Sequence, residues 1–224
     1  MKNEIYLNFD AVRYYSDEAP CYYFNLLVQE GCSWMVEWGD GAWNRYVGTG
    51  EWQSASHCFQ DYGMQSIHIF VEDEGDILGF VSGGRYCGLL KKVNISHCPA
   101  LSYFENWHAE SLDVSANPQL KELCCEHGTF DKLDLSDNPE LEKLTIYFCK
   151  NLIALNLSKN LALKELELIY SGVRRLGLHN RSVLHDVVLE DVELDERSMK
   201  YLHQVLEQNG GSIRKSWWHS MDDE

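Results

Sequence analysis

A twelve-residue pattern of apolar and polar positions recurs along the second half of the chain. It reads LDVSANPQLKEL from Leu112, LDLSDNPELEKL from Leu133 and LNLSKNLALKEL from Leu155. Two weaker copies begin at Val93 and Leu176, so the five starts lie 19, 21, 22 and 21 residues apart. A repeat of this length indicates a solenoid, in which each coil packs on its neighbours.

Each copy predicts a short alternating strand that is followed by a turn. Asparagine stands at the sixth position of three copies, and we expect its side chain to bond the backbone groups of a buried turn. These residues are Asn117, Asn138 and Asn160. A cysteine, Cys98, takes this position in the first copy and is expected to be a small buried filler.

A second apolar series begins 11 residues after the first leucine of the coil, at Leu123, Leu144, Leu166 and Val187. Half-coils this short leave no room for a helical period, so the pattern predicts two short strands per coil. We therefore predict a leucine-rich-repeat solenoid of about five coils over residues 87–194.

The residues that precede the repeats have a different pattern of residue types. Segments rich in aromatic and β-branched residues alternate with turn residues at 5–9, 21–28, 32–38, 54–59 and 64–71. This spacing predicts an immunoglobulin-like β-sandwich over residues 1–86. In the turn Trp38-Gly39-Asp40-Gly41 we expect Asp40 to cap its own turn, and a calcium contact is the alternative.

After the last copy the apolar period becomes helical. Met199, Leu202 and Val205 recur at helical spacing, Asp195 is a plausible N-cap and Gly210 follows the end. Residues 195–224 are thus predicted to hold a helix that caps the open end of the solenoid, and a tail. The tail pair Trp217-Trp218 either folds back over the cap or offers an exposed aromatic site.

The charge of the chain limits the classes of partner that it is expected to bind. The formal net charge is −16, with 4 basic and 13 acidic residues in 1–86 and 15 basic and 22 acidic residues in 87–224. Such a surface repels phosphate backbones, so nucleic-acid binding is not expected, and a basic protein partner is favoured. No apolar run reaches the roughly 18 residues of a membrane span.

The cysteines and the N-terminal residues indicate in which cellular compartment the protein is expected. The eight cysteines show no regular spacing, so most are expected to be free thiols. The start MKNEIYLNFD has no apolar signal stretch. A cytoplasmic location is favoured for the sequence as it stands, and a secreted or cell-surface location follows if a signal peptide was removed.

None of the candidate reactive clusters has the spacing that catalysis or metal binding requires. The clusters are Cys124-Cys125-Glu126-His127, Asp131 with Asp134, His179 with His185, and the glycines around Gly83 and Gly84. A nucleophilic cysteine needs a histidine within reach, zinc needs three or four converging ligands, and a phosphate loop needs a following helix. We therefore predict no catalytic, cofactor-binding or metal-binding residue and no cofactor.

Two motifs resemble known families. The turn at 38–41, with His57, Phe59 and Gly63, resembles the signature of PKD-like domains of immunoglobulin type. The repeat pattern of leucine, x, leucine, serine, x, asparagine resembles the leucine-rich repeats of Bacteroidetes proteins, as does the pairing of the two domains. This resemblance implies a cell-surface or secreted binding protein.

The remaining prediction is recognition by an exposed solenoid face. Residues between the inward leucines should form outward rows, to which tyrosines near the strands add anchors. The candidate partner-binding residues are Tyr103, Asp113, Asp134, Thr145, Tyr147, Asn156, Glu167 and Tyr170. The alternative for the tyrosines is structural stacking without a ligand.

The function predicted is a non-enzymatic scaffold that binds a protein partner. One form of it is an acidic intracellular solenoid that neutralises a basic effector. Adhesion to a glycan or a matrix protein is the second hypothesis, and a hydrolase or metal-dependent enzyme is the third.

Overall fold

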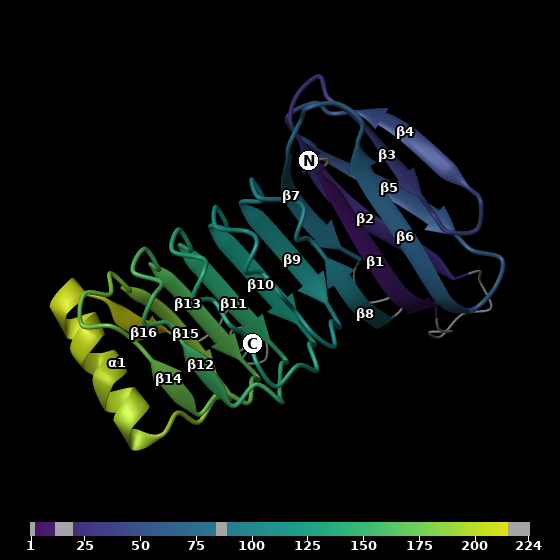
Figure 1. The fold of residues 1–224 in the computed structure, drawn as a ribbon. Helices are drawn as coiled ribbons and strands as arrows, with labels where there is room; N and C mark the ends of the chain where they lie inside the picture. Colours follow the sequence, from purple (N-terminus) through teal and green to yellow (C-terminus); the bar gives the residue numbers. More distant parts are fainter. Residues whose placement is uncertain (1–2, 12–19, 84–88, 215–224) are drawn as a thin grey trace, which may run out of the picture.

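One sheet of nine strands runs through the molecule from its N-terminal part to its C-terminal helix (Figure 1). The computed structural model describes residues 3–11, 20–83 and 89–214. The strand order in this sheet is β16-β15-β13-β11-β10-β9-β7-β2-β5, and a second sheet has the order β4-β3-β6-β1-β8. The described residues are mainly β, with one helix near their C-terminal end.

The N-terminal part contributes seven strands. They are β1 (Glu4–Ala11), β2 (Cys21–Val28), β3 (Ser33–Glu37), β4 (Trp43–Val47), β5 (Trp52–Cys58), β6 (Gly63–Val71) and β7 (Ile77–Ser82). All five segments predicted here are strands. The sequence pattern missed β4, whose side chains are mostly exposed, and β7, where a glycine interrupts a largely buried run, because neither strand alternates cleanly.

The two sheets pack against each other through aromatic side chains. The ring of Phe9 on β1 lies 4.4 Å from that of Tyr22 on β2, and Phe24 on β2 lies 6.3 Å from Trp34 on β3. The assignment of this region to a PKD-like family stays a prediction.

The solenoid is built on parallel strands that pair in register, one per coil. These are β9 (Tyr103–Trp107), β10 (Glu122–Glu126), β11 (Lys143–Tyr147), β13 (Glu165–Ile169) and β15 (Asp186–Glu190), and β16 (Ser212–Arg214) pairs with β15. Leucines of both apolar series are buried in the core between the two walls of the coil. The second series is therefore confirmed as strands.

The first series forms strands in only part of the solenoid, so the expectation of two strands in every coil was wrong. Strands β12 (Ala154–Asn156) and β14 (Arg175–Gly177) pair in a sheet of their own, whereas 112–114 and 133–135 carry no strand. Only three residues precede the turn on this wall, as the three-residue strands β12 and β14 show, so few backbone groups are available for ladder hydrogen bonds.

Strand pairing links the regions on either side of the predicted boundary at 86/87. Strand β7 pairs in parallel with β9 of the first coil, and β8 (Leu89–Asn94) pairs with β1. Of the glycine cluster considered as a phosphate loop, Gly84 lies outside the described residues. The first coil thus has its open edge covered by β7, as the last coil has its end covered by a helix.

Asparagine side chains tie the turns of successive coils together, as predicted. The Asn138 amide donates to the carbonyls of Val114 and Asn117 at 2.9 Å each, and Asn160 does the same to Leu135 and Asn138. Asn117 donates to the carbonyls of Ile95 and Cys98. Each side chain is buried, so it satisfies carbonyls that water does not reach.

The C-terminal helix α1 (Glu196–Asn209) closes the stack. Asp195 is its N-cap and accepts from the Ser198 amide, and Gly210 ends it in the left-handed conformation, as the sequence predicted. Asn209 donates to the carbonyls of Ser182 and Leu184 at 2.9 Å each. The helix therefore supplies to the last coil the type of bond that asparagine supplies to the others. The tail with Trp217-Trp218 lies outside the described residues.

The cysteines are mostly free thiols, as predicted, with one exception. Cys21 and Cys58 face each other across β2 and β5 and form a disulfide, a pairing that needed knowledge of which strands are neighbours. Cys32, Cys98, Cys124, Cys125 and Cys149 are free, and Cys98 and Cys149 are buried fillers. Cys87 lies outside the described residues.

The asparagine ladder gives a first prediction. The variant Asn138→Ala removes two buried hydrogen bonds, to the carbonyls of Val114 and Asn117, each of which keeps only the backbone amide of its own turn. At about 1 kcal/mol for each bond, it should lower the free energy of unfolding by about 2 kcal/mol, measured by urea denaturation. The control is Asn180→Ala at an exposed site, which should change it by less than about 0.5 kcal/mol. Equal effects of the two variants would contradict a structural ladder.

Candidate interaction surfaces

The outer face of the parallel sheet carries two aligned rows of side chains, which we call the sheet face. Strand alternation buries residues such as Phe104 and Leu123 and turns their neighbours outward. One row contains Tyr103, Glu122, Lys143, Glu165 and Asp186. The other contains Glu105, Cys124, Thr145, Glu167, Val188 and Arg214.

The sheet face is acidic. Its two rows hold five carboxylates against the cations Lys143 and Arg214. Lys143 lies 3.3 Å from Glu165 and 3.5 Å from Glu167, and Arg214 pairs with Asp186 at 2.6 Å. Burial lowers the pKa of Lys143, but the charges of Glu167 and Glu165 outweigh that effect and raise the pKa above its usual value. Both cations are thus already engaged by carboxylates of the same face.

Aromatic side chains flank the first strand of the sheet face. Glu105 accepts hydrogen bonds from the Tyr103 hydroxyl and from the Trp107 indole, both at 3.0 Å. Trp52 meets Tyr103 edge to face at 5.4 Å and lies over Gly79, where a Cβ would be only 2.5 Å from the indole. These contacts hold the aromatic rings in fixed positions beside the acidic rows.

A ladder of rings follows the ends of the parallel strands. The rings of His108 and His127 stack at 5.1 Å, those of His127 and Phe148 at 4.7 Å, and those of Phe148 and Tyr170 at 4.9 Å. Parallel strands lie about 4.8 Å apart, so the sheet itself imposes this stacking distance. We call these four residues the ring ladder.

Every member of the ring ladder has a positive φ, between 48° and 63°, and so does Asp191 in the next coil. Each backbone N–H nevertheless continues the ladder of the sheet, as His127 does by donating to the Tyr147 carbonyl at 2.8 Å. The left-handed conformation disfavours residues other than glycine. Ring stacking adds a favourable contact at the four ladder positions, whereas Asp191 adopts this conformation without a ring.

The sequence analysis missed three of these four rings. Of the tyrosines predicted as anchors, Tyr170 belongs to the ladder, and Tyr147 lies beside it with its ring 4.6 Å from that of Phe148. The missed residues are His108, His127 and Phe148. A signal was present, because the positions 108, 127, 148, 170 and 191 are spaced as the repeat starts are.

The predicted partner-binding residues divide between the two walls of the solenoid. Tyr103, Thr145 and Glu167 lie on the sheet face, and Thr145 donates to Glu167 at 3.4 Å. Tyr147 and Tyr170 lie at its edge, with their rings 6.4 Å apart. The structure thus brings five of the eight residues to one side.

The other three predicted residues cap turns on the opposite wall. Asp113, Asp134 and Asn156 each accept from the backbone amide two residues on, at 3.0 to 3.1 Å. Hydrogen bonds from Ser115 and Ser136 hold the pKa of Asp113 and of Asp134 below the usual range, so both remain charged. Their role in the turn is structural.

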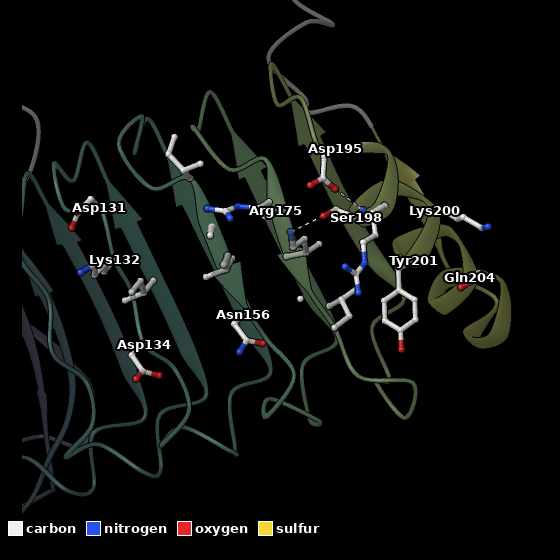
Figure 2. Close-up of a pocket in the computed structure, with 18 residues that line it drawn as sticks. Asp131, Lys132, Asp134, Asn156, Arg175, Asp195, Ser198, Lys200, Tyr201 and Gln204 are labelled. Atoms are coloured by element: carbon white, nitrogen blue, oxygen red, sulfur yellow. Dashed lines mark hydrogen bonds between the residues drawn. The ribbon is translucent and has the colours of Figure 1, made fainter.

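A groove of about 1150 Å³ lies on this opposite wall, between the third to fifth coils and helix α1. Figure 2 shows Asp131, Lys132 and Asp134 toward one end and Lys200, Tyr201 and Gln204 on the helix at the other. Residues of β12 and β14, among them Asn156 and Arg175, lie between the two ends.

Two of the residues considered for chemistry, Cys124 and Asp40, have contacts that the structure describes. Burial raises the pKa of the Cys124 thiol, which disfavours a nucleophilic thiolate. Asp40 accepts from the Ala42 amide at 2.9 Å, as expected of a turn cap, and also bonds His57 at 2.6 Å. His57 stacks on Trp38, so residues of the PKD-like motif meet in space.

Among residues 3–11, 20–83 and 89–214, no group of three or more histidine, cysteine, aspartate and glutamate side chains has an arrangement that could hold a metal ion. The single described helix is neither long nor apolar enough to span a bilayer.

The ring ladder gives a second prediction, which concerns its backbone. Phe148→Ala removes the stacking and keeps the strain, whereas Phe148→Gly removes both, so the glycine variant should be more stable by about 1 kcal/mol in urea denaturation. Tyr147, one residue earlier on β11, is the control: there the alanine variant should be the more stable. The same order at both positions would contradict the assigned strain.

Comparisons with known proteins give little family information. No protein-family model and no curated protein sequence matches the chain. Among solved structures, the chain is similar to the functional domain of InlJ from Listeria monocytogenes, which is described as including a cysteine ladder. The identity is 24% and the TM-score 0.44, over 48% of this chain and 24% of that one. The match therefore spans about a quarter of the length of that solved chain.

Proposed function

We propose that this chain is a non-enzymatic recognition scaffold, which binds a basic segment of a protein partner on its sheet face. The observation that carries the proposal is the charge of that face: five carboxylates stand in two rows, and the two cations among them are already paired. A partner that brings lysine or arginine side chains would complement the face.

The scaffold is suited to recognition because its binding groups are held in place. In-register pairing fixes the spacing between neighbouring side chains at about 4.8 Å. Hydrogen bonds to Glu105 orient Tyr103 and Trp107 next to the acidic rows. Little side-chain freedom remains to be lost on binding, which favours affinity.

The net charge of −16 adds a long-range contribution to this proposal. A field of one sign speeds the encounter with a partner of opposite sign and is weakened by salt. It also disfavours nucleic acid as the ligand.

The sequence resemblances fit the same proposal. The repeat motif is of the leucine-rich type, and we propose that the N-terminal sheets form a PKD-like domain that covers the first coil. Trp38, Asp40 and His57 support that part, because His57 on β5 stacks on Trp38 and bonds to Asp40 of the turn.

A second candidate is adhesion to a glycan. Trp52 favours it, because 44% of its surface is exposed beside Tyr103. The ring ladder disfavours it, because each inner ring of the stack has both faces covered by its neighbours, whereas a sugar needs an open ring face. A basic protein partner therefore explains more of the surface.

The third prediction tests the sheet face with a labelled peptide of alternating arginine and serine. The variant Glu122→Lys with Glu165→Lys should weaken its binding about tenfold in fluorescence anisotropy at low salt, since each reversal removes an attraction and adds a repulsion. Raised salt should weaken binding to the unmodified chain.

The control makes the same change of net charge away from the sheet face, as Glu140→Lys with Glu207→Lys, both at exposed positions. It should retain binding within about twofold. Equal losses in the two double variants would contradict a localised face. Retention of the chain on a glycan resin without binding of the basic peptide would favour adhesion.

A further inference from the structure

The groove beside helix α1 differs in charge from the rest of the molecule. Four cations line it, Lys132, Arg175, Arg197 and Lys200, together with the three carboxylates of Asp131, Asp134 and Asp195. The groove therefore has a small positive balance in a chain of net charge −16. It lies on the wall opposite the sheet face.

The carboxylates and the cations of the groove are not equivalent. Asp134 and Asp195 each accept a backbone amide, from Ser136 at 3.0 Å and from Ser198 at 2.7 Å. None of the four cations takes part in an ion pair within the described residues, whereas neighbouring Arg174 approaches Glu193 at 3.9 Å. The groove cations are thus available to an incoming anion.

Charge is distributed unevenly along the groove. Asp131, Lys132 and Asp134 belong to the third coil, and the acidic row continues from there to Asp113 in the second. Arg175 belongs to the fifth coil, and Arg197 and Lys200 belong to the helix. One end is therefore weakly acidic and the other end basic (Figure 2).

The basic end is rigidly built. The buried hydroxyl of Ser198 on α1 accepts from the Leu176 amide of β14 at 2.9 Å, which joins the helix to the coil. The exposed neighbours Arg175 and Arg197 both lower the pKa of Asp195, although the bonds from Ser198 lower it more. Both guanidinium groups are therefore near one point, the N-cap of the helix.

We propose that this groove is a second binding site, which takes an extended peptide segment of mixed charge from a protein partner. Carboxylates of the segment would lie at Arg175, Arg197 and Lys200, and a cationic end would lie at Asp131 and Asp134. The groove extends across the third, fourth and fifth coils to helix α1, so it has the length for an extended chain. Guanidinium groups bind carboxylates in a bidentate geometry.

A peptide fits this groove better than a nucleic acid. A phosphate backbone carries a negative charge at every step and would meet Asp131, Asp134 and Asp195 along the groove. A mixed-charge segment places its carboxylates at one end only. With the acidic sheet face on the opposite wall, the chain would hold two partner segments of different charge at once.

The test uses a fluorescein-labelled peptide with a glutamate cluster at one end, an uncharged middle and a lysine pair at the other. The unmodified chain should bind it at low salt. Arg175→Glu with Arg197→Glu should weaken binding about tenfold, because two attractions become repulsions. The urea midpoint shows whether this variant folds. If it does not, Arg175→Gln with Arg197→Gln takes its place, because it removes the two charges without adding a repulsion.

The matched control is Lys150→Glu with Lys159→Glu, which changes the net charge equally at exposed sites outside the groove. It should change binding by less than about twofold. The sheet-face variant Glu122→Lys with Glu165→Lys should bind this mixed-charge peptide as the unmodified chain does. Loss of binding at the groove is therefore distinguishable from loss of binding at the sheet face.

Three results would overturn the proposal. The first is that the unmodified chain does not bind the mixed-charge peptide. The second is that the groove variant and the matched control lose binding equally. The third is that a single-stranded oligonucleotide competes for the site more strongly than the peptide does.

Discussion

The structure depends on satisfying the buried backbone groups of a coil that recurs about every 21 residues. Ladder hydrogen bonds between parallel strands do this on one wall, and the amides of Asn117, Asn138 and Asn160 do it at the turns. Each carbonyl that an asparagine contacts also accepts a backbone amide of its own turn, so the asparagine bonds add the link between one coil and the next. Backbone groups at the two ends of the stack also need hydrogen-bond partners. Strand β7 supplies them at one end and Asn209 of α1 at the other.

This regularity also generates the surfaces. Strand pairing in register aligns every outward side chain with its equivalent in the next coil, so a column of the repeat becomes a row on the surface. One such column gives acidic residues on the sheet face, and another gives the stacked rings at its edge. Differences between coils then set the local chemistry, as where aspartate in the second and third coils gives way to Asn156 and Gly177 in the fourth and fifth.

The repeats made the solenoid and its capping helix predictable, because period, capping residues and the asparagine position are local signals. Strands β4 and β7 were not predictable from the pattern, since one is exposed and the other is interrupted by Gly79. The Cys21–Cys58 disulfide and the sharing of a sheet between β7 and β9 depend on pairings between distant segments, which a single sequence does not reveal. The groove beside α1 depends on where the helix docks, so its cations were not recognised as a group. His108, His127 and Phe148 were predictable in principle, since they follow the repeat spacing.

The central claim is that the sheet face receives a basic partner. It is tested most directly by labelling carboxylates with a carbodiimide, with and without the arginine–serine peptide, and locating the labels by mass spectrometry. The account predicts that Glu105, Glu122 and Glu165 on the sheet face become less reactive in the complex, while Asp113 on the opposite wall and the exposed Glu140 do not change. Unchanged labelling of the sheet face, or equal protection of Asp113 and Glu140, would contradict it.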